Sequence, residues 1–151
     1  MIVIGEHGAA YALEQPGARA GGQATVYRAR CLDDGRAVAV KVAAVPGDEA
    51  LRRTWRTLRT LSGHPQLGRR LVPIWDTGTW DERPFLVMEW LPDTLAHLAA
   101  EWSLPRRLAE AHAVVEAVAE LHAEGVVHGD LKPANVLYCD EQAGPILADF
   151  S

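Results

Sequence analysis

The segment 128–137 is the part of this 151-residue chain that most limits what the chain can fold into. It reads His-Gly-Asp-Leu-Lys-Pro-Ala-Asn-Val-Leu, and Asp-Phe-Ser follows at 149–151. Transfer of a phosphoryl group needs a carboxylate that orients the accepting hydroxyl, a cation near the moving phosphate, and oxygen ligands for magnesium. The two segments carry side chains for all of these tasks, namely Asp130, Lys132, Asn135 and Asp149.

This pattern resembles the catalytic loop of protein kinases, in which an Asp precedes a metal-binding Asn by five residues. A lysine two places after the Asp is similar to the serine/threonine branch of that family rather than the tyrosine branch. The resemblance implies that Asp130 orients the substrate hydroxyl and that Lys132 neutralises charge on the transferring phosphate. It also implies that Asn135 and Asp149 bind Mg²⁺, with Mn²⁺ as an alternative. His128 is expected to be a core histidine that supports the loop.

The two lysines of the chain, Lys41 and Lys132, stand out because the other basic residues are thirteen arginines. A compact ammonium group is not interchangeable with a planar guanidinium group. Lys41 ends the sequence Val-Ala-Val-Lys, which resembles the kinase strand whose Lys holds the α- and β-phosphates of ATP. Both lysines therefore fall where the resemblance requires an ammonium group directed at phosphate.

The segment 19–29 falls where kinases have a glycine-rich hairpin that covers the ATP phosphates. When the segment is aligned on Val26, the three glycine positions of that hairpin fall on Arg19, Gly21 and Ala24. Gly21 keeps the pattern, Gly22 adds backbone freedom beside it, and Arg19 departs from it. The resemblance therefore assigns Gly21 and Gly22 to ATP binding.

The segment 84–92 resembles the hinge that connects the two lobes of a kinase. The resemblance places Met88 at the back of the nucleotide pocket as the gatekeeper residue. It places the backbones of Glu89 and Leu91 at the edge of the adenine. The residues that would sandwich the adenine ring are Val26, Ala39 and Leu137.

Helical spacing of apolar residues predicts a helix over 48–61, with Asp48 as its cap. In kinases the corresponding αC helix carries a Glu that pairs with the strand lysine. Here that position falls on Thr54 or Trp55, depending on the alignment, and neither residue is acidic. Glu49 lies more than a turn earlier and could reach Lys41 only if the helix is shifted.

A second helix is predicted over 105–124, because apolar residues recur there at steps of three and four and Gly125 follows. The apolar residues at these steps are Leu108, Ala111, Val115, Val118 and Leu121. Because the family's large lobe continues past the position of Ser151, we expect the apolar faces of this helix to lack their usual cover. Strands are predicted over 26–31, 37–42, 71–78 and 84–89, with a first strand beginning near 11–14 and a short helix over 94–102.

Composition limits the classes of partner. The chain is 48% hydrophobic with a net charge of −5, which fits a domain with a real core and disfavours a general nucleic-acid binder. No apolar run approaches the length of a membrane span, and the N-terminus has no secretion signal pattern, so a cytoplasmic protein is expected.

We expect an α+β, protein kinase-like fold in a single incomplete domain. The small lobe, an antiparallel β-sheet with one αC-type helix, would span 1–88, the hinge 89–92, and the beginning of the helical large lobe 93–151. The expected function is that of a serine/threonine protein kinase that transfers the γ-phosphate of ATP to an unidentified protein. Because the family's large lobe continues past the position of Ser151, activity of this chain would depend on self-association or on a partner that covers the lobe.

Two alternatives remain open. The absent αC glutamate, together with Arg19, favours a non-catalytic pseudokinase or scaffold module. Gly129 gives weight to a small-molecule phosphotransferase of the aminoglycoside or choline type, because those enzymes also have a His-Gly-Asp loop. In kinases that keep an Arg at the position of Gly129, this Arg meets a phosphate on the activation segment, so this chain is not expected to use that switch.

Overall fold

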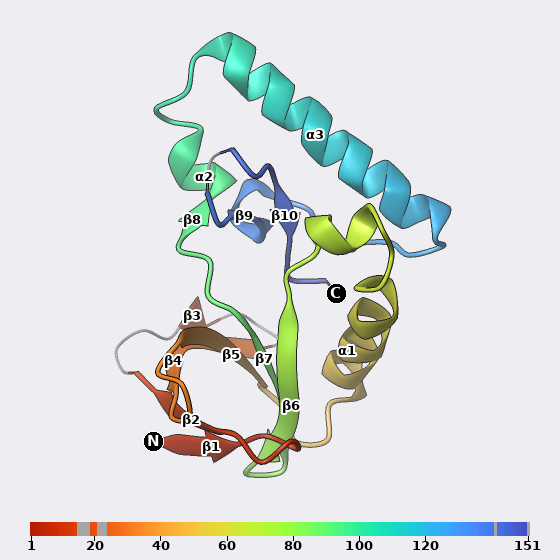
Figure 1. The fold of residues 1–151 in the computed structure, drawn as a ribbon. Helices are drawn as coiled ribbons and strands as arrows, with labels where there is room; N and C mark the ends of the chain where they lie inside the picture. Colours follow the sequence, from red (N-terminus) through yellow and green to blue (C-terminus); the bar gives the residue numbers. More distant parts are fainter. Residues whose placement is uncertain (15–18, 21–23, 141, 151) are drawn as a thin grey trace. The chain divides into compact units, whose positions relative to one another are not determined.

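The computed structural model describes residues 1–14, 19–20, 24–140 and 142–150. The chain forms two compact units, and each is described by itself. The first consists of Met1–Arg59 and Pro73–Trp90, and the second of Thr60–Val72 and Leu91–Ser151. An antiparallel sheet dominates the first unit, and helices with a small sheet make up the second (Figure 1), so the predicted α+β class is confirmed.

The sheet of the first unit has the strand order β1-β2-β4-β5-β7-β6, and β3 pairs with β4. All of its neighbouring strands run antiparallel. The strands are β1 (Ile2–Ile4), β2 (Ala10–Leu13), β3 (Arg19–Ala20), β4 (Ala24–Cys31), β5 (Ala37–Ala43), β6 (Ile74–Trp80) and β7 (Arg83–Glu89).

Alternation along the strands separates the two faces of this sheet, since successive side chains of a strand point to opposite faces. On β5, Val38, Val40 and Val42 face a core that they share with Phe85 and Val87 of β7. Between these valines stand Ala39 and Lys41, which therefore belong to the other face. The valine face of β5 is thus built from β-branched residues, which suit a pleated surface.

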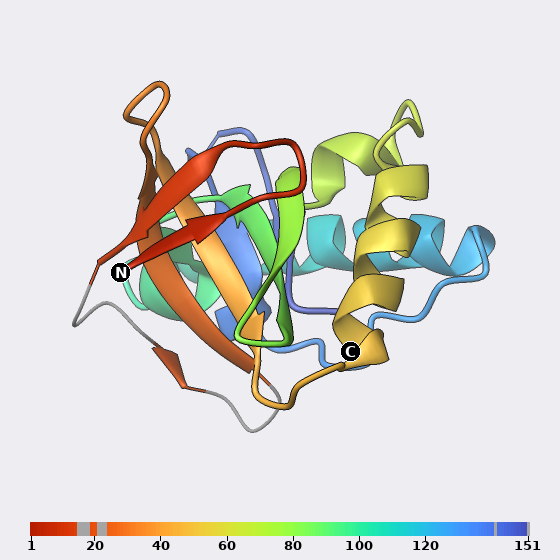
Figure 2. The same cartoon turned by 90° about the horizontal axis from the view of Figure 1, so that it is seen from below.

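The first strand, β1, lies before the segment 11–14 where the sequence pattern predicts the first strand. It lies at one edge of the sheet, and the sheet curls until this edge meets β6 at the other edge (Figure 2). The backbone amide of Glu6, just after β1, donates a hydrogen bond to the Thr77 carbonyl of β6 (2.7 Å). A three-residue strand gives too short an alternation to be recognised in a sequence.

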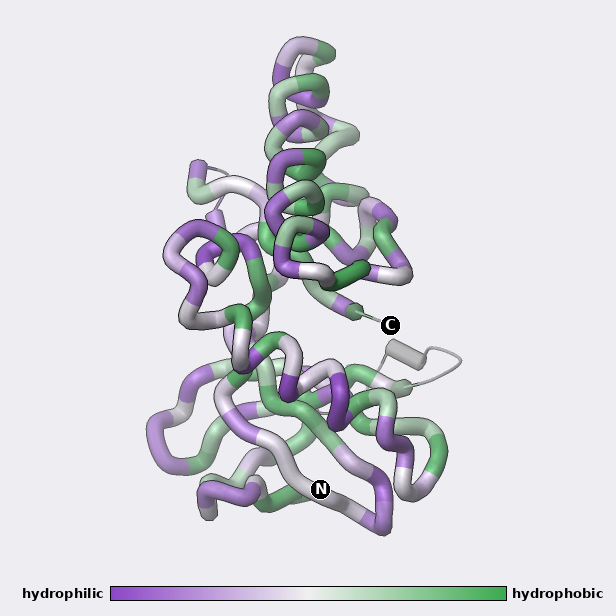
Figure 3. Tube along the Cα trace, turned by 90° about the vertical axis from the view of Figure 1, so that its right-hand side faces the viewer, coloured by the Kyte–Doolittle hydropathy of each residue, from purple (hydrophilic) through white to green (hydrophobic). Residues whose placement is uncertain are grey.

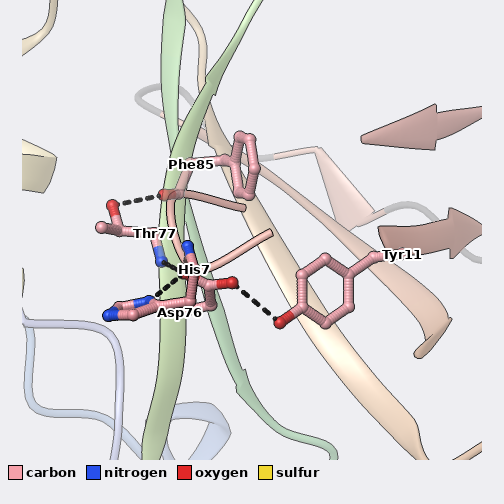
Figure 4. A network of polar contacts seen from close by, with 5 residues as sticks. All are labelled: His7, Tyr11, Asp76, Thr77 and Phe85. Carbon is pink, nitrogen blue, oxygen red and sulfur yellow. Dashed lines mark hydrogen bonds and ion pairs between the residues drawn. The ribbon is translucent and has the colours of Figure 1, made fainter. Parts of the chain in front are cut away.

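A buried carboxylate fastens these edges together (Figure 4). Asp76 is 2% exposed and accepts a hydrogen bond from the Tyr11 hydroxyl at 3.1 Å and from the Thr77 amide at 2.8 Å. The Nδ1 atom of His7 lies 2.7 Å from the same carboxylate. A Cβ atom on Gly5 would collide with it. Because a buried carboxylate is costly unless it is fully hydrogen-bonded, these contacts are what allow Asp76 to lie inside.

One helix, α1 (Glu49–Leu61), connects β5 to the rest of the chain, and the sequence predicted it within one residue. Asp48 caps it as expected, since its Oδ1 atom accepts a hydrogen bond from the Ala50 amide at 2.8 Å. Leu51 and Leu58 are buried.

The second unit is built around a three-stranded sheet of order β10-β9-β8. The backbone amide of Val72 donates to the Leu147 carbonyl at 3.1 Å, and the Trp102 ring packs edge-on against Tyr138. The Tyr138 hydroxyl donates to Glu110 at 3.1 Å, which ties a long helix to this sheet. The elements are η1 (Leu67–Arg70), β8 (Asp93–Thr94), α2 (Leu95–Leu98), α3 (Leu104–Ala123), η2 (Pro133–Asn135), β9 (Val136–Tyr138) and β10 (Ile146–Leu147).

Within the described part of the chain, the helix α3 buries only part of its apolar surface. Its buried residues are Val114, Ala117 and Leu121, whereas Leu108 and Val115 are each 64% exposed. Hydrophobic and hydrophilic residues alternate along this helix (Figure 3). The sequence places Leu108 and Val115 on one stripe of helical spacing, and Val114 and Leu121 on another. Periodicity alone does not choose between them.

The short helix predicted over 94–102 is also smaller in the structure, where α2 covers Leu95–Leu98. Thr94 caps it by accepting a hydrogen bond from the His97 amide at 3.3 Å. Among the described residues, no helix combines the length and the apolar character that crossing a membrane requires.

Candidate functional site

The residues predicted to bind nucleotide in the first unit share one face of its sheet. In the register of the sheet, Val26 of β4 pairs with Lys41 of β5, and Ala39 of β5 pairs with Met88 of β7. Directly paired residues lie on the same face, as do residues two apart on a strand. The four side chains therefore lie together, on the face opposite to the valine core.

Leu86 belongs to the same group, although sequence reasoning did not single it out. It pairs with Lys41 across β5 and β7 and is 1% exposed. Leu86 lies two residues before Met88 on the same strand, and this spacing was the sequence signal that could have placed both residues on one face. Lys41 itself is half-buried, so the stem of its side chain lies among apolar neighbours. Gly21 and Gly22 lie outside the described residues.

The hinge prediction places Glu89 at the end of β7, where its backbone amide donates to the Pro73 carbonyl at 2.9 Å. Because this amide is already hydrogen-bonded, a backbone contact of Glu89 with a ligand would have to be made by its carbonyl group. Leu91, which begins the next segment of the second unit, is buried, and Leu137 on β9 is half-buried. The roles of these residues in nucleotide binding stay predictions.

The αC-type helix carries no acidic residue in its middle. The Thr54 hydroxyl donates to the Ala50 carbonyl of the preceding turn at 3.1 Å, and the Trp55 ring lies under the guanidinium group of Arg59. Glu49 is the first residue of α1 and has its carboxylate 3.9 Å from Arg52.

In the second unit, His128 is the structural centre of the predicted catalytic loop. It is 2% exposed, and its Nε2 atom lies 2.7 Å from the Ala148 carbonyl, which it reaches as a donor. Its Nδ1 atom accepts the Asp130 amide at 3.3 Å, and its ring lies 4.4 Å from the Phe150 ring. The histidine thus holds the loop and the segment before Asp149 against each other.

Asp130 is held by two side chains of the same loop. The Lys132 ammonium donates to its Oδ2 atom at 2.7 Å, and the Asn135 amide donates to the same atom at 2.9 Å. The hydrogen bond from Lys132, followed by that from Asn135, holds the pKa of the Asp130 carboxyl below its usual range. Asp130 is therefore ionised at neutral pH, as a carboxylate that orients a hydroxyl must be.

Asn135 and Asp149 are brought onto neighbouring segments. Asn135 is 5% exposed, and its carbonyl accepts the Ala148 amide at 3.0 Å. Its side-chain nitrogen donates to Asp130, so its side-chain oxygen is left for another partner. Asp149 follows Ala148 with φ of 58°, a left-handed conformation that Asp tolerates better than most residues.

This donor set fits magnesium. Mg²⁺ prefers oxygen ligands and is usually bound by one or two protein side chains together with phosphate oxygens and water. The side-chain oxygen of Asn135 and the carboxylate of Asp149, on adjacent segments, match that coordination preference. Among the described residues there is no group of three or more His, Cys, Asp or Glu side chains that would suit a metal bound by the protein alone.

Gly129, which departs from the common kinase pattern, has φ of 84°. Glycine adopts this left-handed conformation without the steric cost that other residues incur. The backbone here therefore suits the glycine of the sequence. Ser151, the other departure in this unit, lies outside the described residues.

Comparisons with known proteins agree with this geometry. The family model described as "Protein kinase domain" matches residues 19–151. The serine/threonine-protein kinase PknL of Mycobacterium bovis is 38% identical over 141 residues, which cover 86% of this chain and 34% of that protein. The DNA damage-responsive serine/threonine-protein kinase RqkA of Deinococcus radiodurans is 40% identical over 138 residues, or 86% of this chain and 20% of that protein.

The chain thus spans at most about a third of the length of these relatives. A family model that covers most of the chain, and a loop in which Asp130, Lys132 and Asn135 are held together by hydrogen bonds, identify the same group of proteins. The chain belongs to the protein kinase family.

Proposed function

We propose that this chain carries the nucleotide-binding and catalytic-loop residues of a serine/threonine protein kinase, which transfers the γ-phosphate of ATP to a protein hydroxyl. The observation that supports this most strongly is the Asp130 carboxylate, 2.7 Å from the Lys132 ammonium and 2.9 Å from the Asn135 amide. The relatives named as serine/threonine kinases support the class of acceptor.

In this proposal Asp130 accepts a hydrogen bond from the substrate hydroxyl and orients its oxygen toward the phosphate. Lys132 neutralises negative charge that develops on the transferring group. Lys41 holds the α- and β-phosphates, and the apolar residues beside it contact the adenine. Magnesium, held by Asn135 and Asp149, would neutralise charge on the phosphates.

The test is transfer of labelled γ-phosphate from MgATP to a mixed protein acceptor such as dephosphorylated casein. Replacing Asp130 with Asn should lower the rate by a factor of about 10²–10⁴, the usual range for loss of a general base. Asp33→Asn is the matched control, because Asp33 is an exposed carboxylate on the β4–β5 turn. Equal rates for wild type and Asp130→Asn would contradict the proposal.

A scaffold function is the second candidate, and a specific observation favours it. The only carboxylate on α1 is Glu49, at the first residue and 3.9 Å from Arg52, so the helix offers Lys41 no acidic residue at the usual position. Binding of MgATP without phosphate transfer to casein, choline or an aminoglycoside would support this function. Transfer to the small molecules alone would instead support the small-molecule phosphotransferase.

A further inference from the structure

The proposed function leaves one arginine on the nucleotide face of the first unit without a role. Arg28 of β4 pairs with Ala39 of β5, and Ala39 pairs with Met88 of β7. The three residues form one row across the sheet, and directly paired residues lie on the same face. Arg28 therefore lies in line with two residues that the proposed function assigns to nucleotide binding.

The rows of this face differ in their distance from the phosphate end of the site. Val26 and Lys41 form the neighbouring row, two residues along each strand from Arg28 and Ala39. In the proposed function Lys41 holds the α- and β-phosphates, so its row marks the phosphate end. Two residues of an antiparallel strand span about 6.8 Å. Arg28 thus lies one row farther from the phosphates, at the end of the face that the adenosine part of ATP would occupy.

Two neighbours in the first unit hold the guanidinium group of Arg28. Its central carbon lies 5.4 Å from the centroid of the Trp90 ring, and its Nε atom lies 3.3 Å from the Glu14 carboxylate. A cation over an aromatic ring is attracted to it, and the ion pair restricts the same group further. Such contacts reduce the rotamer freedom that a long side chain would otherwise lose when it binds a ligand.

The terminal nitrogens of Arg28 still have donors to offer. A guanidinium group carries five N–H donors, and the contact with Glu14 uses the one on Nε. Within the described part of the chain, the two terminal nitrogens have no hydrogen-bond partner. The side chain is 46% exposed, so a ligand on this face of the sheet can reach these donors.

We propose that Arg28 is a further nucleotide-binding residue, whose terminal nitrogens donate hydrogen bonds to neutral acceptor atoms of the adenosine part of ATP. The ring nitrogens of adenine and the oxygens of ribose are such acceptors. Because Glu14 balances the charge of Arg28, the contact depends on hydrogen bonding more than on attraction of the phosphate charge. The assignment rests on the proposed function, since it adds a contact to the same nucleotide site.

Arg30 is a matched control on the same strand. It lies two residues beyond Arg28 on the same face, one row farther from the phosphate end. Its Nη2 atom lies 3.8 Å from the same Glu14 carboxylate, and its Nη1 atom donates to the Gly35 carbonyl at 2.9 Å. A general effect of losing a contact with Glu14 would therefore show in variants of both arginines.

The test compares adenosine with MgATP, each measured by its displacement of fluorescent mant-ATP from the full chain. Arg28→Met keeps an unbranched stem beside Trp90 and removes the donors. It should weaken both ligands by the same factor, about three- to tenfold, because the lost hydrogen bond is made to the part that they share. Arg30→Met should change either affinity less than about twofold. Lys41→Ala should weaken MgATP and leave adenosine within about twofold.

Three results would overturn the assignment and leave the nucleotide site itself standing. They are unchanged affinities in Arg28→Met, an equal loss in Arg30→Met, and a loss in Arg28→Met that affects MgATP but not adenosine. The last result would show that Arg28 acts on the phosphates. If the wild type binds neither ligand, the proposed function fails, and the assignment fails with it.

Discussion

Replacing Tyr11 with Phe tests how the first unit is held together. The Tyr11 hydroxyl donates to the Asp76 carboxylate at 3.1 Å, and both residues are buried, at 3% and 2% exposed. The change removes one hydrogen bond and leaves the packing of the ring unaltered. Asp76 keeps the Thr77 amide and His7 as partners.

The expected cost follows from the charge of the acceptor. A hydrogen bond to a charged group contributes about 1.5–3 kcal/mol, so the free energy of unfolding should fall by about 2 kcal/mol. For a chain of this size that lowers the melting temperature by about 4–8 °C. Tyr27→Phe is the control, because the Tyr27 hydroxyl has no hydrogen-bond partner within the described part of the chain, and it should cost less than about 0.5 kcal/mol.

The difference in stability between the wild type and Tyr11→Phe should depend on pH. Burial, and then the nearby Asp76 carboxylate, raise the pKa of Tyr11 above its ordinary value of 10.0. The unfolded chain therefore releases this proton first, so the stability that Tyr11 contributes is complete below pH 10 and is lost as the pH rises further. Chemical denaturation from pH 7 to 11 should show the difference between wild type and Tyr11→Phe shrinking above pH 10. A difference below 0.5 kcal/mol at pH 7 would refute the reasoning.

Three further predictions concern other parts of the chain. Gly5→Ala should destabilise the first unit by about 1–3 kcal/mol in a thermal melt, because its Cβ atom would collide with the Asp76 carboxylate; an unchanged melting temperature would contradict this. Leu121→Ala should cost about 2–5 kcal/mol in urea denaturation and Leu108→Ala less than about 0.5, since the first is 0% and the second 64% exposed; equal costs would show that the assigned face of α3 is wrong. Removing Lys132, as Lys132→Ala, should raise the pKa of Asp130 toward its ordinary value in a carbon-13 titration, and no shift would mean that the ion pair does not form in solution.

The sequence was sufficient to predict those parts of the fold and the candidate site that depend on residue types at close spacing. Asp130, Lys132 and Asn135 lie within six consecutive residues, so the contacts among them follow from the local chain path. The αC-type helix was likewise predicted within one residue, because its capping Asp and its apolar spacing are both local signals.

Features that depend on distant contacts could not be predicted. Asp76 meets partners 65 and 69 residues away, and nothing in its own neighbourhood indicates that it is buried. Which apolar stripe of α3 is covered depends on its packing against the sheet to which Tyr138 contributes, so helical spacing alone could not predict it. The grouping of Leu86 with Lys41 depends on strand register, which a sequence pattern does not give.

The most direct test of the nucleotide-binding claim is the thermal melting of this chain with and without MgATP. A ligand that binds only the folded state stabilises it by about 2.7 kcal/mol at 100 times its dissociation constant, so a rise of about 5–10 °C is predicted. The rise should require Mg²⁺ and should be largely lost in Lys41→Ala and in Asp149→Ala, while Asp33→Asn keeps it. A cooperative melt whose temperature is unaffected by MgATP would contradict the claim.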